Sequence, residues 1–183
     1  MRRALAAAVA LLLATGCGIG AEEEPRALPG TASASSSSPA PAPTGSQAVP
    51  VFLADADGLV EVERSLPPAP GPEVLLLAVL EGPTVAERAR GLRSVVPPEA
   101  TTSAAAPADG VVTVQLPEVD PIDDAGTNDE LLGYAQIVLT LDASDEVSGV
   151  LFERGGEPVD VPRADGSLSP GRPARAADYA ALL

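Results

Sequence analysis

One low-complexity stretch limits where this chain can fold. Of the 19 residues from 30 to 48, 18 are Gly, Ala, Ser, Thr or Pro. Such a composition buries too little apolar surface to offset the entropy lost on ordering. We therefore predict a disordered tether over residues 17–48 and one folded domain over residues 49–183. That domain contains 37 Val, Leu and Ile residues, enough for a single core.

The N-terminus has the features of a bacterial export signal. Arg2 and Arg3 precede eleven uncharged residues, 4–14, which are too few to span a bilayer. Residues 13–17, Leu-Ala-Thr-Gly-Cys, resemble a lipobox, the motif in which a cysteine receives diacylglycerol before cleavage. The resemblance implies a signal peptide over residues 1–16, lipid attachment at Cys17, and an anchor on the outer face of the cell membrane. The alternative is an ordinary secretory signal with an unrelated cysteine.

The composition excludes several kinds of chemistry. The chain has no His, and all 11 of its basic residues are Arg, so Lys is absent too. Histidine bases and metal ligands, Ser-His-Asp triads and lysine Schiff bases are therefore excluded. The formal net charge of −15 opposes binding to nucleic acid. We predict that the protein is not an enzyme and holds no cofactor.

Strand signals occur in pairs separated by turn residues. Residues 51–54 and 59–63 flank Asp57-Gly58, which favours positive φ and a tight hairpin. Residues 111–116 follow Asp109-Gly110, with a weaker partner over residues 101–106. Residues 150–153 and 159–161 are joined through Gly155-Gly156, and Pro158 suits an edge strand.

Helix signals separate these pairs. Pro72 begins a helix that ends before Gly82-Pro83, and Thr84 with Glu87 forms a capping box for a second helix that ends at Gly91. A third helix begins with a similar pair and has one apolar face. A last segment, residues 174–183, is expected to dock. The pair that starts the third helix is Thr127 and Glu130, and its apolar face consists of Leu131, Leu132, Ala135, Val138 and Leu139. The last segment is expected to dock through Tyr179, Leu182 and Leu183.

This element order predicts an α+β domain, with one antiparallel or mixed sheet of about six strands and two to four helices packed on it. The alternative, a parallel α/β wind, fits the paired strands less well.

Several segments together resemble the GerMN domain, a module of bacterial sporulation and spore-germination proteins. The matching segments are residues 51–62, 80–91, 112–114, 135–141 and 150–162, with Arg175, Asp178 and Tyr179. The residues that carry the motif are Gly82, Pro83, Thr84, Glu87, Gly91 and Gln136. The resemblance implies a non-enzymatic interaction or scaffold domain with no catalytic residues. It also implies an envelope protein as partner, or self-association.

A second hypothesis is a lipoprotein that binds a small ligand or Ca²⁺. The sequence Asp55-Ala56-Asp57-Gly58 begins like a calcium loop, but Leu59 and Leu66 stand where oxygen ligands are needed. Residues 118–130 contain six acids, and hard cations prefer clustered carboxylates. The six are Glu118, Asp120, Asp123, Asp124, Asp129 and Glu130. A solvated acidic loop is the competing interpretation.

Gln136 lies beside the apolar face of the third helix and has two interpretations. Its amide either satisfies a buried backbone group or lines a contact surface, and we favour the first. Gly82, Pro83, Thr84 and Glu87 are interpreted as architectural residues that turn one helix into the next.

Overall fold

The computed structural model describes residues 45–98, 100, 103–118 and 127–183, all of which belong to one unit, Pro39–Leu183. In chain order, the elements are β1 (Gln47–Ala54), β2 (Leu59–Leu66), α1 (Pro72–Glu81), α2 (Val85–Ala89), β3 (Ser103–Ala104), β4 (Val111–Leu116), α3 (Thr127–Leu141), β5 (Gly149–Arg154), β6 (Glu157–Pro158) and the 3-10 helix η2 (Ala176–Leu182). The predicted α+β class, the order of elements and the six strands are confirmed.

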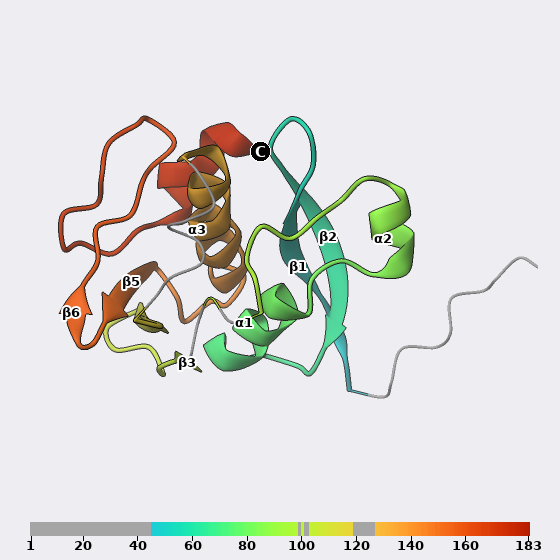
Figure 1. Cartoon of the computed structure of the whole chain (residues 1–183). Coiled ribbons are helices and arrows are strands. Elements are labelled where there is room, and N and C mark those ends of the chain that lie inside the picture. The colour runs from blue at the N-terminus through green and yellow to red at the C-terminus, as the bar shows by residue number, and fades with distance from the viewer. Residues whose placement is uncertain (1–44, 99, 101–102, 119–126) are drawn as a thin grey trace, which may run out of the picture. The chain divides into compact units, whose positions relative to one another are not determined.

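The strands form two sheets, where one was expected. β1 and β2 make an antiparallel pair, and the other sheet has the order β3-β4-β5-β6. β4 and β5 are parallel, with Val114 opposite Phe152, and α3 provides the crossover between them. A parallel neighbour requires such a crossover, so the second sheet is mixed. The two sheets remain separate because α3 lies between them (Figure 1).

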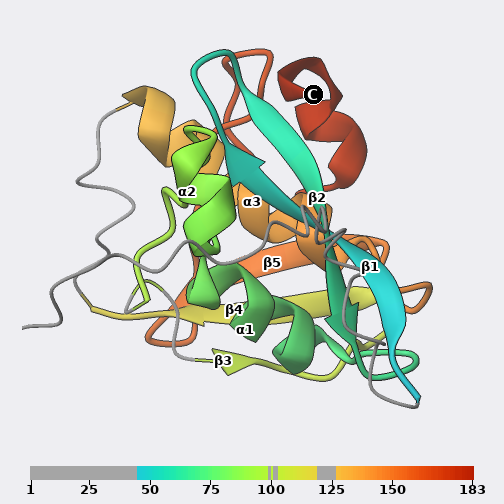
Figure 2. The ribbon, with the colours of Figure 1, turned by 90° about the vertical axis from the view of Figure 1, so that its right-hand side faces the viewer.

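The third helix is more buried than its sequence predicted. α3 contacts β1, α1, β5 and η2, and residues 132–141 are all buried. The residues of the predicted apolar face lie in the core, but the residues between them are buried too, because neighbours cover this helix on several sides (Figures 1 and 2). On the side of β5, the rings of Tyr134 and Phe152 meet edge to face with centroids 4.9 Å apart.

The strand partners of β4 and β5 are shorter than predicted. β3 covers only Ser103–Ala104, and β6 lies at Glu157–Pro158 instead of residues 159–161. Gly155 and Gly156 both have positive φ and form a two-residue turn, which places Glu157 directly opposite Arg154. Pro158 lies on an edge strand, as predicted.

Two Asp-Gly pairs each lie in a hairpin turn, but the backbone conformations of the two turns differ. Asp109 and Gly110 have φ of +52° and +79°, as predicted for a tight turn. Neither Asp57 nor Gly58 has positive φ, so that part of the prediction is wrong. Instead, Asp55 Oδ1 accepts hydrogen bonds from the N–H groups of Asp57 and Gly58 at 2.8 and 2.9 Å. Glycine is needed at position 58 because a Cβ atom there would collide with the carbonyl oxygen of Leu182.

The C-terminal segment docks through Tyr179, which is fully buried and donates from its hydroxyl to the carbonyl of Pro162 at 3.0 Å. Leu182 packs against the core, but Leu183 is 65% exposed. The prediction for Leu183 is therefore wrong. A 3-10 helix has three residues per turn, so Tyr179 and Leu182 lie on the same face of η2, whereas Leu183 does not.

Candidate functional site

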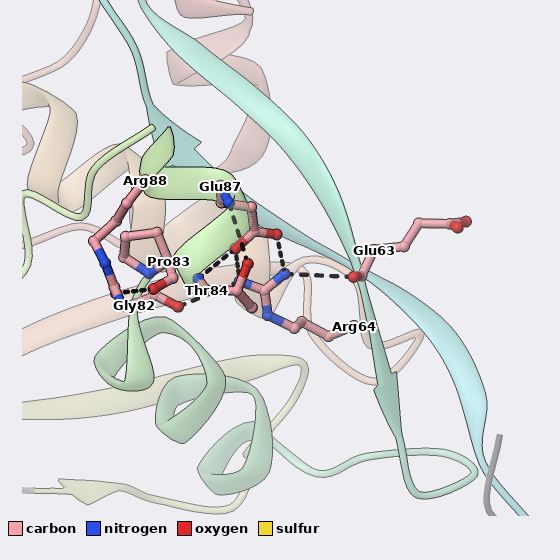
Figure 3. Close-up of polar contacts among 7 residues, drawn as sticks. All are labelled: Glu63, Arg64, Gly82, Pro83, Thr84, Glu87 and Arg88. Carbon is pink, nitrogen blue, oxygen red and sulfur yellow. Dashed lines mark hydrogen bonds and ion pairs between the residues drawn. The ribbon is translucent and has the colours of Figure 1, made fainter. Parts of the chain in front are cut away.

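The motif residues 82–91 lie where α1 passes into α2, beside β2 (Figure 3). Gly82 ends α1 with φ of +66°, a value that favours glycine, and its N–H donates to the carbonyl of Val79 at 3.1 Å. Pro83 follows, and its carbonyl accepts a hydrogen bond from Nη1 of Arg88. These residues therefore redirect the chain between two helices.

Thr84 and Glu87 form a capping box at the start of α2. The Thr84 hydroxyl accepts from the N–H of Glu87 at 3.3 Å, and Oε2 of Glu87 accepts from the N–H of Thr84 at 2.7 Å. Gly91, with φ of +88°, follows the last turn and donates to the carbonyl of Arg88 at 3.0 Å. A five-residue helix is unstable by itself, so α2 depends on such contacts.

Arg64 joins this cluster from β2. Its Nη1 and Nη2 atoms lie 2.6 and 2.7 Å from the two carboxylate oxygens of Glu87, a bidentate ion pair. Nη2 also donates to the carbonyl of Gly82 at 3.3 Å. The side chains of Arg64 and Glu87 are only 14% and 8% exposed. We call this group, Arg64, Gly82, Thr84 and Glu87, the clamp, because it fixes α2 and the end of α1 to β2.

The clamp is unsuited to proton transfer. The Arg64 guanidinium, with help from the N–H of Thr84, lowers the pKa of Glu87 from 4.5 to about 2. A carboxylate with this pKa stays ionised at neutral pH, whereas a general acid or base needs a pKa near the working pH. The guanidinium is likewise occupied by Glu87 and Gly82. The arrangement can hold elements together but has no group free for acid–base chemistry.

Sequence reasoning missed Arg64, although a signal was present. In β2, apolar Val60 and Val62 alternate with Glu61 and Glu63, a pattern that places the valines inward and the glutamates outward. Continuing that alternation places Arg64 on the inward face, where a charge needs a partner. The partner, Glu87, lies 23 positions further along the chain.

Gln136 connects α3 with two other segments. Its Oε1 accepts from the N–H of Val95 at 2.9 Å, and its Nε2 donates to the carbonyl of Phe52 at 2.8 Å. The Phe52 N–H in turn donates to Oγ1 of Thr140 at 3.2 Å. Gln136 and Thr140 are completely buried, so the amide bonds buried backbone groups and lines no exposed surface. Sequence reasoning placed Thr140 in a segment that matches the family but gave this residue no role.

The described residues give the calcium hypothesis no metal site. Among the described residues, no group of three or more Asp, Glu, His or Cys side chains is placed to hold a metal ion. Asp129 is bound by Arg93 through contacts of 2.7 and 3.1 Å, and the Asp55 carboxylate caps its own turn. Asp120, Asp123 and Asp124 lie outside the described residues, as does Cys17.

The fold and the clamp agree with one class of protein, a single GerMN-type α+β domain. The Germane family model, described as sporulation and spore germination, matches residues 50–160. The chain therefore belongs to the Germane family. No curated protein matches it.

One solved structure shows the same fold, and two further solved structures are also similar to this chain. The tandem GerMN domains of the sporulation protein GerM from Bacillus subtilis align with a TM-score of 0.55 and 16% identity, over 73% of this chain and 47% of that one. This chain thus spans about half of the tandem structure. The first GerMN domain of GerM alone aligns with a TM-score of 0.49 and 18% identity, over 68% of this chain and 95% of that domain. A candidate lipoprotein from Clostridium perfringens aligns with a TM-score of 0.44 and 16% identity, over 75% of this chain and 93% of that one.

Proposed function

We propose that this chain is a lipid-anchored, non-enzymatic interaction module on the outer face of a bacterial cell membrane. The N-terminal sequence supports the anchor, because Arg2, Arg3 and an apolar stretch precede the lipobox cysteine, Cys17. A tether over residues 17–48 would let the domain reach a neighbouring protein while staying near the bilayer. Membership of the Germane family supports the interaction role that the resemblance to GerMN domains implies. No helix among the described residues is long and apolar enough to cross a membrane.

The use of buried polar side chains carries the non-enzymatic part of the proposal. In the described part of the chain, the buried polar side chains are Glu87, Gln136, Thr140 and Ser169. Each of them accepts a hydrogen bond from a backbone N–H; for Ser169 the donor is the N–H of Val161, at 3.1 Å. Substrate pockets present a few polar groups to their ligand. Among the described residues, only Nε of Arg163 is a buried side-chain polar atom without a hydrogen bond, and it lies 3.5 Å from Oδ2 of Asp178 in an ion pair. Here these groups stabilise the scaffold itself.

Two linked measurements in the producing cells test this proposal. The first compares wild type with Cys17→Ser by membrane fractionation and by mass spectrometry of the N-terminal peptide. We expect an acylated Cys17 and loss of the variant from the membrane fraction. Cys17→Ser protein that stays in the membrane fraction as before would refute the anchor.

The second measurement is in-cell crosslinking and affinity purification of the same two proteins. We expect an envelope protein to be enriched near stoichiometry with the anchored form only. No enrichment from abundant, folded, anchored protein would refute the interaction role.

A further inference from the structure

One edge of β2 faces away from its partner strand. On β1, Phe52 turns its N–H and C=O toward Thr140 and Gln136, and Ala54 exchanges two hydrogen bonds of 2.8 Å with Arg93. These positions of β1 therefore do not bond to β2. Residues opposite each other in an antiparallel pair are either both bonded or both unbonded.

The register then fixes which groups of β2 point outward. Phe52 lies opposite Glu61, and Pro50 lies opposite Glu63. The backbone N–H and C=O groups of Glu61 and Glu63 therefore point to the outer edge of β2. Arg64 Nη1 donates to the Glu63 carbonyl at 3.4 Å, in agreement with this direction. The clamp therefore already provides one donor to this carbonyl, whose second lone pair is left for an added strand.

The two outer edges of the sheet formed by β1 and β2 differ in whether other segments cover them. The outer edge of β1 is closed by α3 and by the bridge to Arg93. Within the described residues, no strand pairs with the outer edge of β2, which lies at the periphery of the domain (Figure 2). The other sheet ends in two-residue strands, β3 and β6. Within the part of the chain that the structure describes, β2, with eight residues, is thus the longest strand with an unpaired edge.

The charge of the edge selects its partner. The side chains of Glu61 and Glu63 are exposed, and that of Glu63 points away from the clamp (Figure 3). A second copy of β2 at this edge would bring glutamates against glutamates, which is unfavourable between neighbouring strands. Lysine or arginine at alternate positions of an added strand would instead pair with both glutamates.

We propose that the outer edge of β2, residues 59–63, binds an extended basic segment of a partner protein by strand addition. Backbone hydrogen bonds would provide affinity, and the glutamates would choose basic over acidic strands. This inference rests on the proposed interaction function and names its surface and the chemistry of its partner.

Amide hydrogen exchange measured by NMR tests the edge residue by residue. The sample is the chain from residue 17 onward with Cys17→Ser, and the probe is a capped seven-residue peptide of alternating Val and Lys. Without peptide, the amides of Glu61 and Glu63 should exchange fast, whereas those of Val60 and Val62, bonded to β1, should exchange slowly. Saturating peptide should slow the amides of Glu61 and Glu63 by about tenfold or more.

Charge reversal provides a matched pair of variants. Glu61→Lys should weaken peptide binding by about fivefold, because an attractive cross-strand pair becomes repulsive. Glu157→Lys changes the net charge equally, at an exposed strand glutamate of the other sheet, and should change the affinity by less than about twofold. A peptide of alternating Val and Glu should bind Glu61→Lys better than wild type.

Several results would overturn the proposal. One is slow exchange of the Glu61 and Glu63 amides in the free protein, because the edge would then already be covered. Concentration dependence would tell whether a second copy or the chain itself covers it. Others are no binding at millimolar peptide, binding that leaves both amides unprotected, and equal weakening by the two variants.

Photocrosslinkers placed at positions 61 and 157 in cells separate this proposal from the proposed function. An anchor-dependent partner captured from position 61 but not from position 157 supports both. A partner captured from other positions only would refute the edge and leave the interaction function standing. Without any anchor-dependent partner, the interaction function itself fails.

Discussion

Two polar contacts connect neighbouring elements of this domain, and they differ in charge and in depth. Gln136 and Thr140 join α3 to β1 with uncharged groups that are completely buried. Arg64 and Glu87 join β2 to α2 with full charges, and their side chains keep 14% and 8% of their surface exposed. Burying a charge costs far more than burying an amide, even when the charge is paired. The comparison shows that the interior uses neutral contacts and the periphery uses the ionic one.

Removal of the neutral contact should have the largest effect. Gln136→Met keeps most of the side-chain volume but leaves the Val95 N–H and the Phe52 carbonyl without partners. We expect the free energy of unfolding to fall by about 4 kcal/mol, since each unsatisfied buried group costs about 1–3 kcal/mol. Urea unfolding followed by circular dichroism measures this loss, which should be the same at pH 5 and pH 8. A loss below about 1 kcal/mol would contradict the role assigned to Gln136.

Removal of the ionic contact should come next. Glu87→Ala leaves Arg64 unpaired and the Thr84 N–H uncapped, so we expect a loss of about 3 kcal/mol in unfolding free energy. Glu81→Ala, an exposed glutamate at the end of α1, is the control and should change stability by less than about 0.5 kcal/mol. Equal unfolding midpoints for the two variants in urea would show that the clamp contributes nothing.

The pH dependence separates the two contacts. The pKa of Glu87 in the folded protein is lowered from 4.5 to about 2, so its ion pair stabilises the fold above pH 4.5. That stabilisation is lost as the pH falls from about 4.5 to about 2. Allowing for solvent near the pair, we expect wild type to lose about 2 kcal/mol of its advantage over Glu87→Gln across this range. The difference between the two proteins, measured by urea unfolding at several pH values, should be constant above pH 6. A difference that stays constant down to pH 2 would contradict the low pKa.

An exposed ion pair should give the smallest effect. Arg93 and Asp129 also form a bidentate pair, but their side chains are 46% and 36% exposed. Asp129→Asn should cost about 0.5 kcal/mol, and 1 M NaCl should remove most of that difference. Thermal unfolding at low and high salt checks this. A cost as large as that of Glu87→Ala would show that burial does not set the strength of these pairs.

Local signals predicted much of this fold. The Pro72 start, the Gly82 stop, the capping box of Thr84 and Glu87, and the Asp109-Gly110 turn depend on residues close in sequence. Such features are encoded in backbone preferences and short-range hydrogen bonds, so they can be read without the tertiary structure.

Features that depend on distant segments were missed. The need for glycine at position 58 arises from Leu182, and the partner of Arg64 comes from another element. α3 was predicted to be buried on one face because its sequence does not show how many elements surround it. The division of the strands into two sheets has the same cause. For the clamp, the only signal in the sequence was the alternation in β2, which places the charged Arg64 on the inward face.

The coupling free energy between Arg64 and Glu87 tests most directly whether the family motif serves the architecture of this domain. It is obtained from the urea unfolding of wild type, Arg64→Met, Glu87→Met and the double variant at pH 7. We expect a coupling of about 2 kcal/mol, with the double variant more stable than either single variant, because no unpaired charge remains buried. A coupling below about 0.5 kcal/mol would contradict the clamp and would mean that Glu87 has another role.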